Sequence, residues 1–320
     1  MVRRLSEFLL DLYRGSREMP ITVFQDWAFE RLQVILPFDS GIWAAGYLDG
    51  DDPVIHNLQT YKQSRDFAES WMSYKDEDPL LSNMIAMPGK AVNVATQAAY
   101  GGQAFYDDHY KPNGIAHILC TGELDPHTAL YSLISLHREN VAEPFSEEER
   151  IIKESLMPHL VETYRLNRMN YMEQARQPSG MTHYSVGASD EGGRMHLVEP
   201  AFTKLILDEW PGWHGPKLPD NLSKCLITDE GRFSGEKSII KFTRLNDLFL
   251  LRGRSRSNLD NLSDRERQIA EHFSLGLTYK QIAQMLQIAP STVRNHLNAI
   301  YLKLRVNNKT DMVTILKMLD

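Results

Sequence analysis

The sequence predicts a multidomain protein of the α+β class, and three observations carry this prediction. The chain of 320 residues is longer than one ordinary domain. Strand-like and helical runs alternate irregularly up to about residue 254, whereas residues 260–320 contain helical patterns alone. Turn-forming residues interrupt the chain at 177–180 and 255–258. We therefore expect three modules, which cover residues 1–176, 181–254 and 260–320.

The first module combines a sheet with helices. It begins with an amphipathic helix, whose apolar face consists of Val2, Leu5, Phe8, Leu9 and Leu12. Helical periodicity recurs at 22–36, 65–87 and 147–176, and strand-like runs lie at 41–48, 54–58, 91–94, 115–121 and 128–137. This order predicts an antiparallel sheet with helices inserted across one face, followed by a long linker helix.

The second module has fewer elements. Strand-like runs lie at 184–186, 194–197, 238–243 and 248–252, and a helix is expected at 200–210. Two strands, a helix and two closing strands predict a small α+β module.

The third module contains four short helices with well-marked ends. Ser263 and Glu266 have the spacing of a capping box, and Thr278 with Gln281 repeats it at the second helix. Pro290 opens the third helix, because proline is preorganised for a first helical turn. The fourth helix is expected at 310–319.

The third of these helices has two different faces. Its apolar face consists of Val293, Leu297, Ile300, Tyr301 and Leu304. Its other face carries donors and cations, namely Thr292, Arg294, Asn295, Asn298 and Lys303. A short helix pair that leads into such a helix is the geometry that inserts the last helix into the major groove of DNA, which is about 12 Å wide. The pattern predicts a helix-turn-helix.

The matching residues also resemble a known family. They are Leu262-Ser263, Arg265-Glu266, Gly276-Leu277, Ile282-Ala283, Thr292-Val293, His296, Ile300 and Lys303-Leu304. Together they resemble the LuxR-type (GerE-like) helix-turn-helix. The resemblance implies phosphate contacts by Lys280 and Thr292 and base contacts by Val293, Arg294 and Asn298. Asn295, Lys303 and Lys309 complete the expected DNA-binding set, whereas His296 is expected to support the helix.

Two positions depart from the family pattern. Gln281 stands where the family has glutamate, which weakens an internal ion pair, and Arg305 replaces the glycine after Lys303-Leu304. A left-handed backbone is costly for arginine, so this turn is expected to be rebuilt or strained. The fourth helix resembles the family's dimer-forming helix, and simple packing on the other three helices is an equal alternative.

Charge restricts DNA contact to the last module. From residue 261 onward the net charge is +3, whereas the whole chain carries −7 and the remainder therefore −10. Phosphates repel the acidic part. Arg252, Arg254 and Arg256 either add phosphate contacts or form an ordinary strand end and linker.

The upstream modules resemble sensor domains. The element order of the first module, together with the segment FYDDHYKPNGIAHIL at 105–119, is similar to GAF-type domains, and the second module resembles a PAS domain in which a loop at 211–216 replaces the inner helices. A GAF-like fold implies a small-molecule pocket, for which the candidates are Trp43, Tyr47, Tyr61, Trp71, Tyr74, Phe105 and Tyr106. For each of these aromatic residues, a role in the core is the alternative.

Several other functions are not expected. Cys120 and Cys225 lie far apart, which is typical of a reducing, cytoplasmic location without disulfides. His117 and Cys120 would point to opposite faces of a strand, so we expect no metal. No membrane span, cofactor motif or catalytic motif was found, and the chain is not expected to be an enzyme.

These observations favour a dimeric transcription regulator that binds a pseudo-palindromic site on double-stranded DNA and whose N-terminal modules respond to a small molecule or protein partner. Two alternatives remain. In the first, the protein pairs with another regulator and blocks it. In the second, it is an enzyme with a DNA-binding tail.

Overall fold

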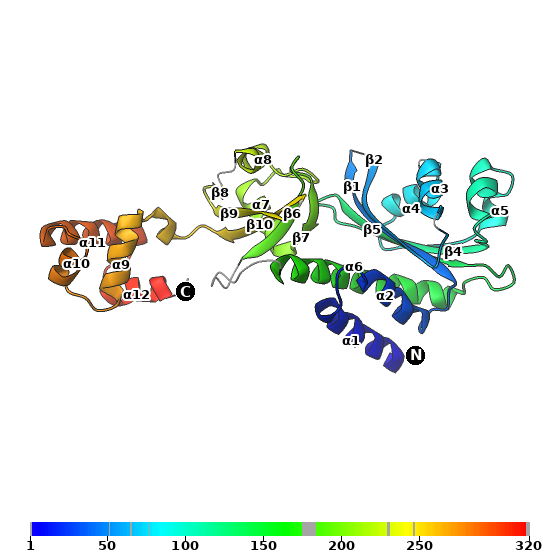
Figure 1. Ribbon diagram of the computed structural model, residues 1–320, viewed down its shortest axis with the longest axis horizontal. Coiled ribbons are helices and arrows are strands. Elements are labelled where there is room, and N and C mark those ends of the chain that lie inside the picture. Colours follow the sequence, from blue (N-terminus) through cyan, green and yellow to red (C-terminus); the bar gives the residue numbers. More distant parts are fainter. Residues whose placement is uncertain are drawn as a thin grey trace.

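The computed structural model describes residues 2–50, 52–64, 66–75, 77–174, 184–228, 231–245 and 247–317. Figure 1 shows an elongated molecule in which two sheet-containing modules lie side by side and a helical module stands apart from them. The structure confirms the predicted α+β class with several modules. The predicted boundary at 177–180 lies outside the described residues. No helix in the described part of the chain is long and apolar enough to cross a membrane.

The first module is built on a five-stranded antiparallel sheet with the order β2-β1-β5-β4-β3. Its strands are β1 (Ser40–Asp49), β2 (Asp52–Tyr61), β3 (Ala91–Ala95), β4 (His117–Leu124) and β5 (Leu130–Arg138). Its helices are α1 (Val2–Glu18), α2 (Phe24–Gln33), α3 (Phe67–Tyr74), α4 (Pro79–Ala86), α5 (Thr96–Tyr100), the π-helical turn η1 (Tyr106–Tyr110) and α6 (Glu147–Gln174).

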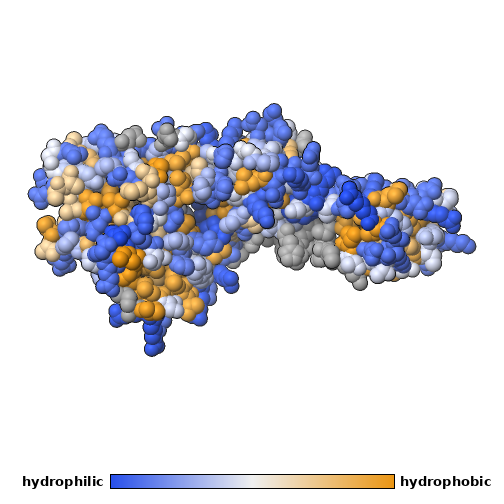
Figure 2. Space-filling view, turned by 180° about the vertical axis from the view of Figure 1, so that it is seen from behind, coloured by the Kyte–Doolittle hydropathy of each residue, from blue (hydrophilic) through white to orange (hydrophobic). Residues whose placement is uncertain are grey.

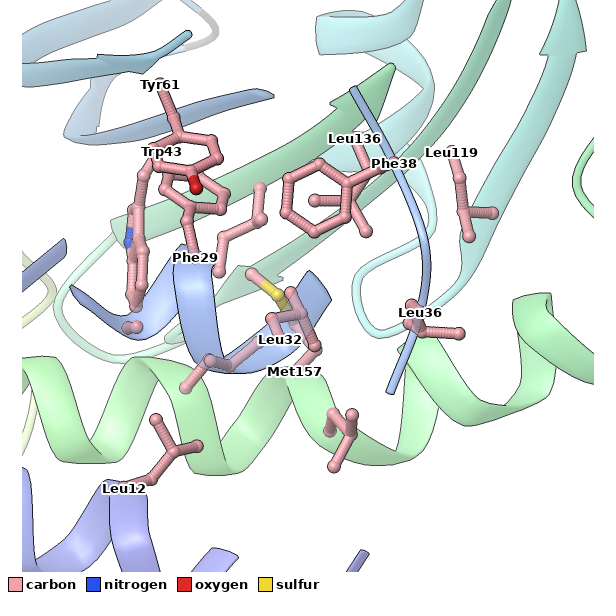
Figure 3. Close-up of a cluster of buried hydrophobic side chains, with 14 of the residues drawn as sticks. Leu12, Phe29, Leu32, Leu36, Phe38, Trp43, Tyr61, Leu119, Leu136 and Met157 are labelled. Atoms are coloured by element: carbon pink, nitrogen blue, oxygen red, sulfur yellow. The ribbon is translucent and has the colours of Figure 1, made fainter. Parts of the chain in front are cut away.

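Helices cover both faces of this sheet, not one face only. The helices α2 and α6 lie on one face, with α1 packed against them, whereas α3, α4, α5 and η1 lie on the other (Figure 1). The interior strand β1 is buried along most of its length, as expected for a strand with covered faces. Figure 3 shows the core on the α6 side, where the ring of Phe29 stacks on Tyr61 at a centroid distance of 5.1 Å and meets Trp43 edge-on.

The helix α1 is only half covered. Its Phe8 and Leu12 are buried against the first module, whereas Val2 and Leu10 are 82% and 54% exposed. Figure 2 shows apolar side chains gathered on the protruding part of the surface that contains this helix. The amphipathic helix predicted from the sequence is therefore present, but Val2 does not belong to its buried face.

The second module is a separate antiparallel sheet with the order β7-β6-β10-β9-β8. Its elements are β6 (Ser185–Ser189), β7 (Met195–Val198), α7 (Pro200–Glu209), α8 (Asp220–Ile227), β8 (Arg232–Ser234), β9 (Ser238–Leu245) and β10 (Leu248–Ser255). The sequence analysis missed α8 and β8. Leu222 and Leu226 anchor the helix α8, and their burial against α7 and the sheet stabilises a segment too short to show clear periodicity.

The third module consists of η2 (Asn258–Asn261), α9 (Asp264–Ser274), α10 (Tyr279–Met285), α11 (Pro290–Leu304) and α12 (Lys309–Lys317). Its own hydrophobic core joins all four α-helices through residues such as Ile269, Ile282, Ile300 and Met312. The 3-10 turn η2 was not predicted. The C-terminal end of the predicted fourth helix, at 318–319, lies outside the described residues.

Candidate nucleic-acid interface

The two capping boxes predicted from the sequence are confirmed. Ser263 donates its N–H to Glu266 Oε2 at 2.7 Å, and its hydroxyl accepts from Glu266 N at 3.3 Å. At α10, Thr278 N donates to Gln281 Oε1 at 2.9 Å, and Gln281 N donates back to Thr278 Oγ1. Gln281 therefore closes a cap although it lacks the charge of a glutamate. These caps fix where α9 and α10 begin.

The helix α11 presents an outer face of polar and cationic side chains. Arg294, Asn295 and Asn298 are exposed, and Thr292 is half-buried near the start of the helix. The Arg294 guanidinium lies 6.0 Å from the centroid of the Tyr279 ring, so α10 supports it from one side. No acidic residue occurs anywhere in α11. This outer face of α11 is suited to an anionic, hydrogen-bonding partner.

The position of Val293 corrects its expected contact with base edges. Val293 is 0% exposed and packs in the core of the third module with Leu297, Ile300 and Leu304. These four residues recur at intervals of three or four, which places them on one side of the helix. Val293 therefore holds α11 in place and does not reach DNA.

Lys303 is engaged inside the protein. Its Nζ lies 2.6 Å from Glu266 Oε2, which joins the end of α11 to the start of α9. Burial raises the pKa of Glu266, but the hydrogen bonds from Lys303 and Ser263 outweigh it, and the pKa is lowered overall. The predicted DNA contact by Lys303 thus competes with an internal ion pair.

Two other predicted cations remain at the surface. Lys280 is exposed on α10, and Lys309 is exposed at the start of α12, with its Nζ 4.5 Å from the centroid of the Phe273 ring. His296, expected to support the helix, is half-buried.

The linker arginines are held by protein groups. Arg254 forms a bidentate ion pair with Asp260, with N–O distances of 2.5 and 2.7 Å, and the Asp260 side chain is only 2% exposed. Arg256 donates to Gly235 O at 2.7 Å and to Asn261 Oδ1 at 3.0 Å. Of the two roles left open by the sequence, these contacts favour the linker, because they tie η2 to the second module.

The aromatic residues proposed for a ligand pocket do not converge on one cavity. Trp43 and Tyr61 lie in the core on the α6 side of the first sheet (Figure 3). Trp71 and Phe105 are buried on the opposite side, where Tyr74 and Tyr106 pack at the margin. Tyr47 lies 6.5 Å from the His196 ring, between centroids, where the first module meets the second.

The space beside Trp71 is almost filled by protein atoms. The cavity there measures about 20 Å³, and Trp71 Nε1 donates to the buried Asp78 Oδ2 at 3.0 Å. Burial raises the pKa of Asp78. In this structure the space holds little more than one water molecule. Among the described residues, no cluster of three or more His, Cys, Asp or Glu side chains is arranged to hold a metal ion.

Residues 260–316 match the family model GerE, described as bacterial regulatory proteins of the luxR family. This match covers the same capped helices and the same outer face of α11. The segment is a LuxR-type helix-turn-helix domain.

Two curated relatives are transcriptional regulators of Bacillus subtilis (strain 168). The transcriptional regulatory protein DesR is 40% identical over 103 residues, which are 32% of this chain and 48% of DesR. The transcriptional regulatory protein LnrK is 27% identical over 125 residues, which are 38% of this chain and 52% of LnrK. The chain thus spans about half the length of the curated relatives that it matches.

Solved structures show weaker similarity. The N-acylhomoserine-lactone-dependent factor CepR2 from Burkholderia cenocepacia aligns over 54% of this chain and 99% of its own, with 16% identity and a TM-score of 0.41. SdiA in complex with octanoyl-rac-glycerol aligns over 97% of this chain and 92% of its own, with 15% identity and the same TM-score. TM-scores this low carry no argument about the ligand of the present chain.

Within the LuxR-type domain, Arg305 adopts the left-handed conformation that the family assigns to glycine. Its φ is 57° and its ψ is 41°, and it ends α11 at the start of the short loop that leads to α12. The helix α12 buries Met312 in the domain's own core, whereas Ile315 and Leu316 are partly buried. Packing within the domain is therefore observed for α12, and a dimer role remains a prediction.

Proposed function

We propose that this chain is a transcription regulator that binds double-stranded DNA through its LuxR-type domain. The observation that carries the proposal is the outer face of α11, which exposes Arg294, Asn295 and Asn298 and lacks acidic residues. Arginine and asparagine are suited to bidentate contacts with guanine and adenine edges in the major groove. Lys280, on the preceding helix, is suited to a phosphate contact.

The charge distribution supports different functions for the three modules. The segment from residue 261 onward carries +3, and the rest of the chain carries −10. The acidic modules are repelled by phosphates, so they are suited to sensing and dimerisation instead of DNA contact. The N-terminal modules accordingly respond to a small molecule or a protein partner.

A homodimer on a pseudo-palindromic site is part of this proposal. Two helix-turn-helix domains of a dimer read half-sites about one helical turn, or 34–36 Å, apart. The exposed apolar residues of α1, including Val2 and Leu10, supply a surface of the kind found at protein contacts. Native mass spectrometry of the freshly purified chain would report both subunit number and any retained small molecule.

The DNA role is tested with an operator obtained by unbiased selection of random DNA. Arg294→Ala is expected to weaken binding to this operator by about 1–3 kcal/mol and to relax base preference at one position. Lys280→Ala is expected to weaken binding to all sequences alike and to reduce the salt slope by about one. Lys224→Ala, on the exposed surface of α8, removes the same charge outside the domain and serves as the control. An Arg294 variant that binds as tightly as the unmodified protein would refute the assignment.

One observation favours a second candidate function, in which the domain pairs with another regulator and blocks it. Leu275 and Leu302 are 79% and 81% exposed on the LuxR-type domain, so both side chains are accessible to a protein partner. If this candidate is correct, the purified chain selects no DNA sequence, and Leu302→Lys abolishes co-purification with a second regulator.

A further inference from the structure

A partly open cavity of about 410 Å³ lies where the first and second modules meet α6. Its walls are the turn between β4 and β5, one side of α6, and β7. The lining residues of α6 include Pro158, Val161, Arg165 and Arg168, whose spacing places them on one stripe of the helix. Small-molecule sites usually measure roughly 300–1,000 Å³. This cavity reaches that size, unlike the space beside Trp71.

Two β-bulges direct histidines toward this cavity. In the β1–β2 register, Ala45 opposes Asn57 and Gly46 opposes Ile55, so His56 is the extra residue of the bulge. Between β6 and β7, Ala188 opposes Leu197 and Ser189 opposes Met195, so His196 is the extra residue of the second bulge. A bulge re-aims the side chain of its extra residue. As a result, the two imidazole rings approach to a centroid distance of 4.4 Å, one from each sheet.

Burial favours the neutral form of both histidines. Burial, with smaller contributions from His196 and Arg168, lowers the pKa of His56 to about 3, and burial lowers the pKa of His196. In the described part of the chain, His56 Nδ1 is buried and has no hydrogen-bond partner. A buried polar atom without a partner is uncommon, and a bound molecule is one explanation for it.

Arg168 is a cation on the cavity wall that has no carboxylate partner among the described residues. The arginines at positions 150 and 165 of the same helix have carboxylate partners, Glu147 and Glu162 respectively. Arg168 forms no ion pair within the described ranges of the chain; its guanidinium lies 5.6 Å from the centroid of the Tyr164 ring and hydrogen-bonds the neutral Tyr164 side chain. It is therefore available to an anion.

The carboxylates on the wall are already countered by protein groups. Asp125 accepts hydrogen bonds from the N–H groups of His127 and Thr128, both at 2.9 Å. Glu162 pairs with Arg165, and the charge of the buried Lys153 acts on Glu123. The rest of the wall is largely apolar and includes Leu130, Val161, Leu197 and Val198.

We propose that this cavity binds a small organic carboxylate with an apolar body. The carboxylate lies against the guanidinium of Arg168 and the imidazole of His56, and the apolar body contacts Val161, Leu197 and Val198. A planar guanidinium recognises a carboxylate through two parallel hydrogen bonds. The inference rests on the sensor role proposed above, for which it names the site and the ligand class.

The location of the cavity gives the ligand a physical effect. Its walls belong to both sensor modules and to the helix that connects them. A ligand that contacts all three stabilises their present arrangement by its binding free energy. The second module leads through β10 and the Arg254–Asp260 ion pair into the LuxR-type domain.

The test measures binding to the full-length chain by isothermal titration calorimetry. The probes are hexanoate and 3-phenylpropanoate, each compared with its uncharged primary amide. At least one carboxylate is expected to bind about tenfold or more tightly than its amide, because a hydrogen bond to a charged acceptor is stronger than one to a neutral acceptor. Arg168→Leu is expected to abolish this preference.

Two further variants separate ligand binding from misfolding. Val161→Trp fills the cavity and is expected to abolish binding of acid and amide alike, whereas Ile151→Trp, at an exposed position of the same helix, leaves it unchanged. The inference is overturned if neither carboxylate binds, if Arg168→Leu keeps the preference for the acid, or if Val161→Trp still binds. DNA binding is measured separately. Arg294→Ala is expected to weaken operator binding and to keep carboxylate binding, so failure of either proposal is distinguished from failure of the other.

Discussion

Replacing Arg305 by glycine tests whether the joint between α11 and α12 stores backbone strain. Arg305 has a φ of 57° and a ψ of 41°. The left-handed conformation costs a residue with a Cβ about 1–2 kcal/mol, whereas glycine adopts it readily. The LuxR-type pattern has glycine at this position. Arginine therefore adds a backbone conformational cost here that glycine would avoid.

The size of the effect follows from two opposing contributions. Glycine loses more conformational freedom on folding, which costs about 0.5–1 kcal/mol. The Arg305 side chain is exposed and forms no ion pair with any described residue, so its removal costs little. Arg305→Gly should therefore raise the free energy of unfolding of the LuxR-type domain by about 0.5–1 kcal/mol.

Amide hydrogen exchange on the full-length chain measures this change. All five tryptophans lie in the first two modules, the last at Trp213, so tryptophan fluorescence does not report on the domain. Exchange in α9 and α11 should slow by about two- to fivefold in Arg305→Gly. Arg305→Ala, which keeps the Cβ, is the matched control and should not slow exchange. Backbone strain at Arg305 is refuted if exchange is faster or unchanged in the glycine variant but slower in the alanine variant. This result would show that the Arg305 side chain, and not its backbone conformation, destabilises the domain.

Three further predictions concern contacts around the same domain. Val293→Ala should lower the free energy of unfolding of the LuxR-type domain by roughly 1–3 kcal/mol, because Val293 is buried in the core. It should weaken binding to all DNA sequences equally, and an altered base preference in a selection assay would contradict this. Lys303→Met should destabilise the domain by about 1–2 kcal/mol, because its partly screened ion pair with Glu266 is lost. Denaturant titrations measure this change, and an unchanged stability would exclude a structural role for the ion pair. Burial raises the pKa of Asp260, but hydrogen bonds from Arg254 and Ser257 outweigh it and lower the pKa to about 2. The resulting stability is present above the unfolded pKa of about 3.9 and lost as pH falls toward the folded value, so calorimetry should show a smaller acid-induced loss in Asp260→Asn than in the unmodified chain.

Features that depend on residues close together in the chain could be predicted from the sequence. The caps at Ser263 and Thr278 involve residues three apart, so spacing alone predicted them. The two faces of α11 followed from helical periodicity, with one error. Val293 was assigned both to the apolar stripe and to the DNA contacts, and its complete burial decides between the two. The helix α8 was missed because its stability comes from burial of Leu222 and Leu226 and not from its own sequence.

The residues that line a ligand pocket could not be predicted from the sequence. The aromatic candidates were taken together as one set, but Trp43, Tyr47 and Tyr61 lie on strands, whereas Trp71, Tyr74, Phe105 and Tyr106 lie in or beside the helices that cover one face of the sheet. The structure divides them between two cores, with Trp43 on one side and Trp71 on the other. The residues that line the larger cavity, such as Arg168 and His196, have no sequence motif in common and were not singled out.

The sequence by itself determined the helix-turn-helix, its caps, the polar and apolar faces of α11 and the unusual Arg305, because each depends on residues within one or two helical turns. Only the tertiary structure decided that His56 and His196 meet, and that Arg168 lies on the wall of the same cavity. The physical reason is the bulge in each sheet: one extra residue changes which face the following side chains occupy, and no alternation in the sequence marks where that residue falls.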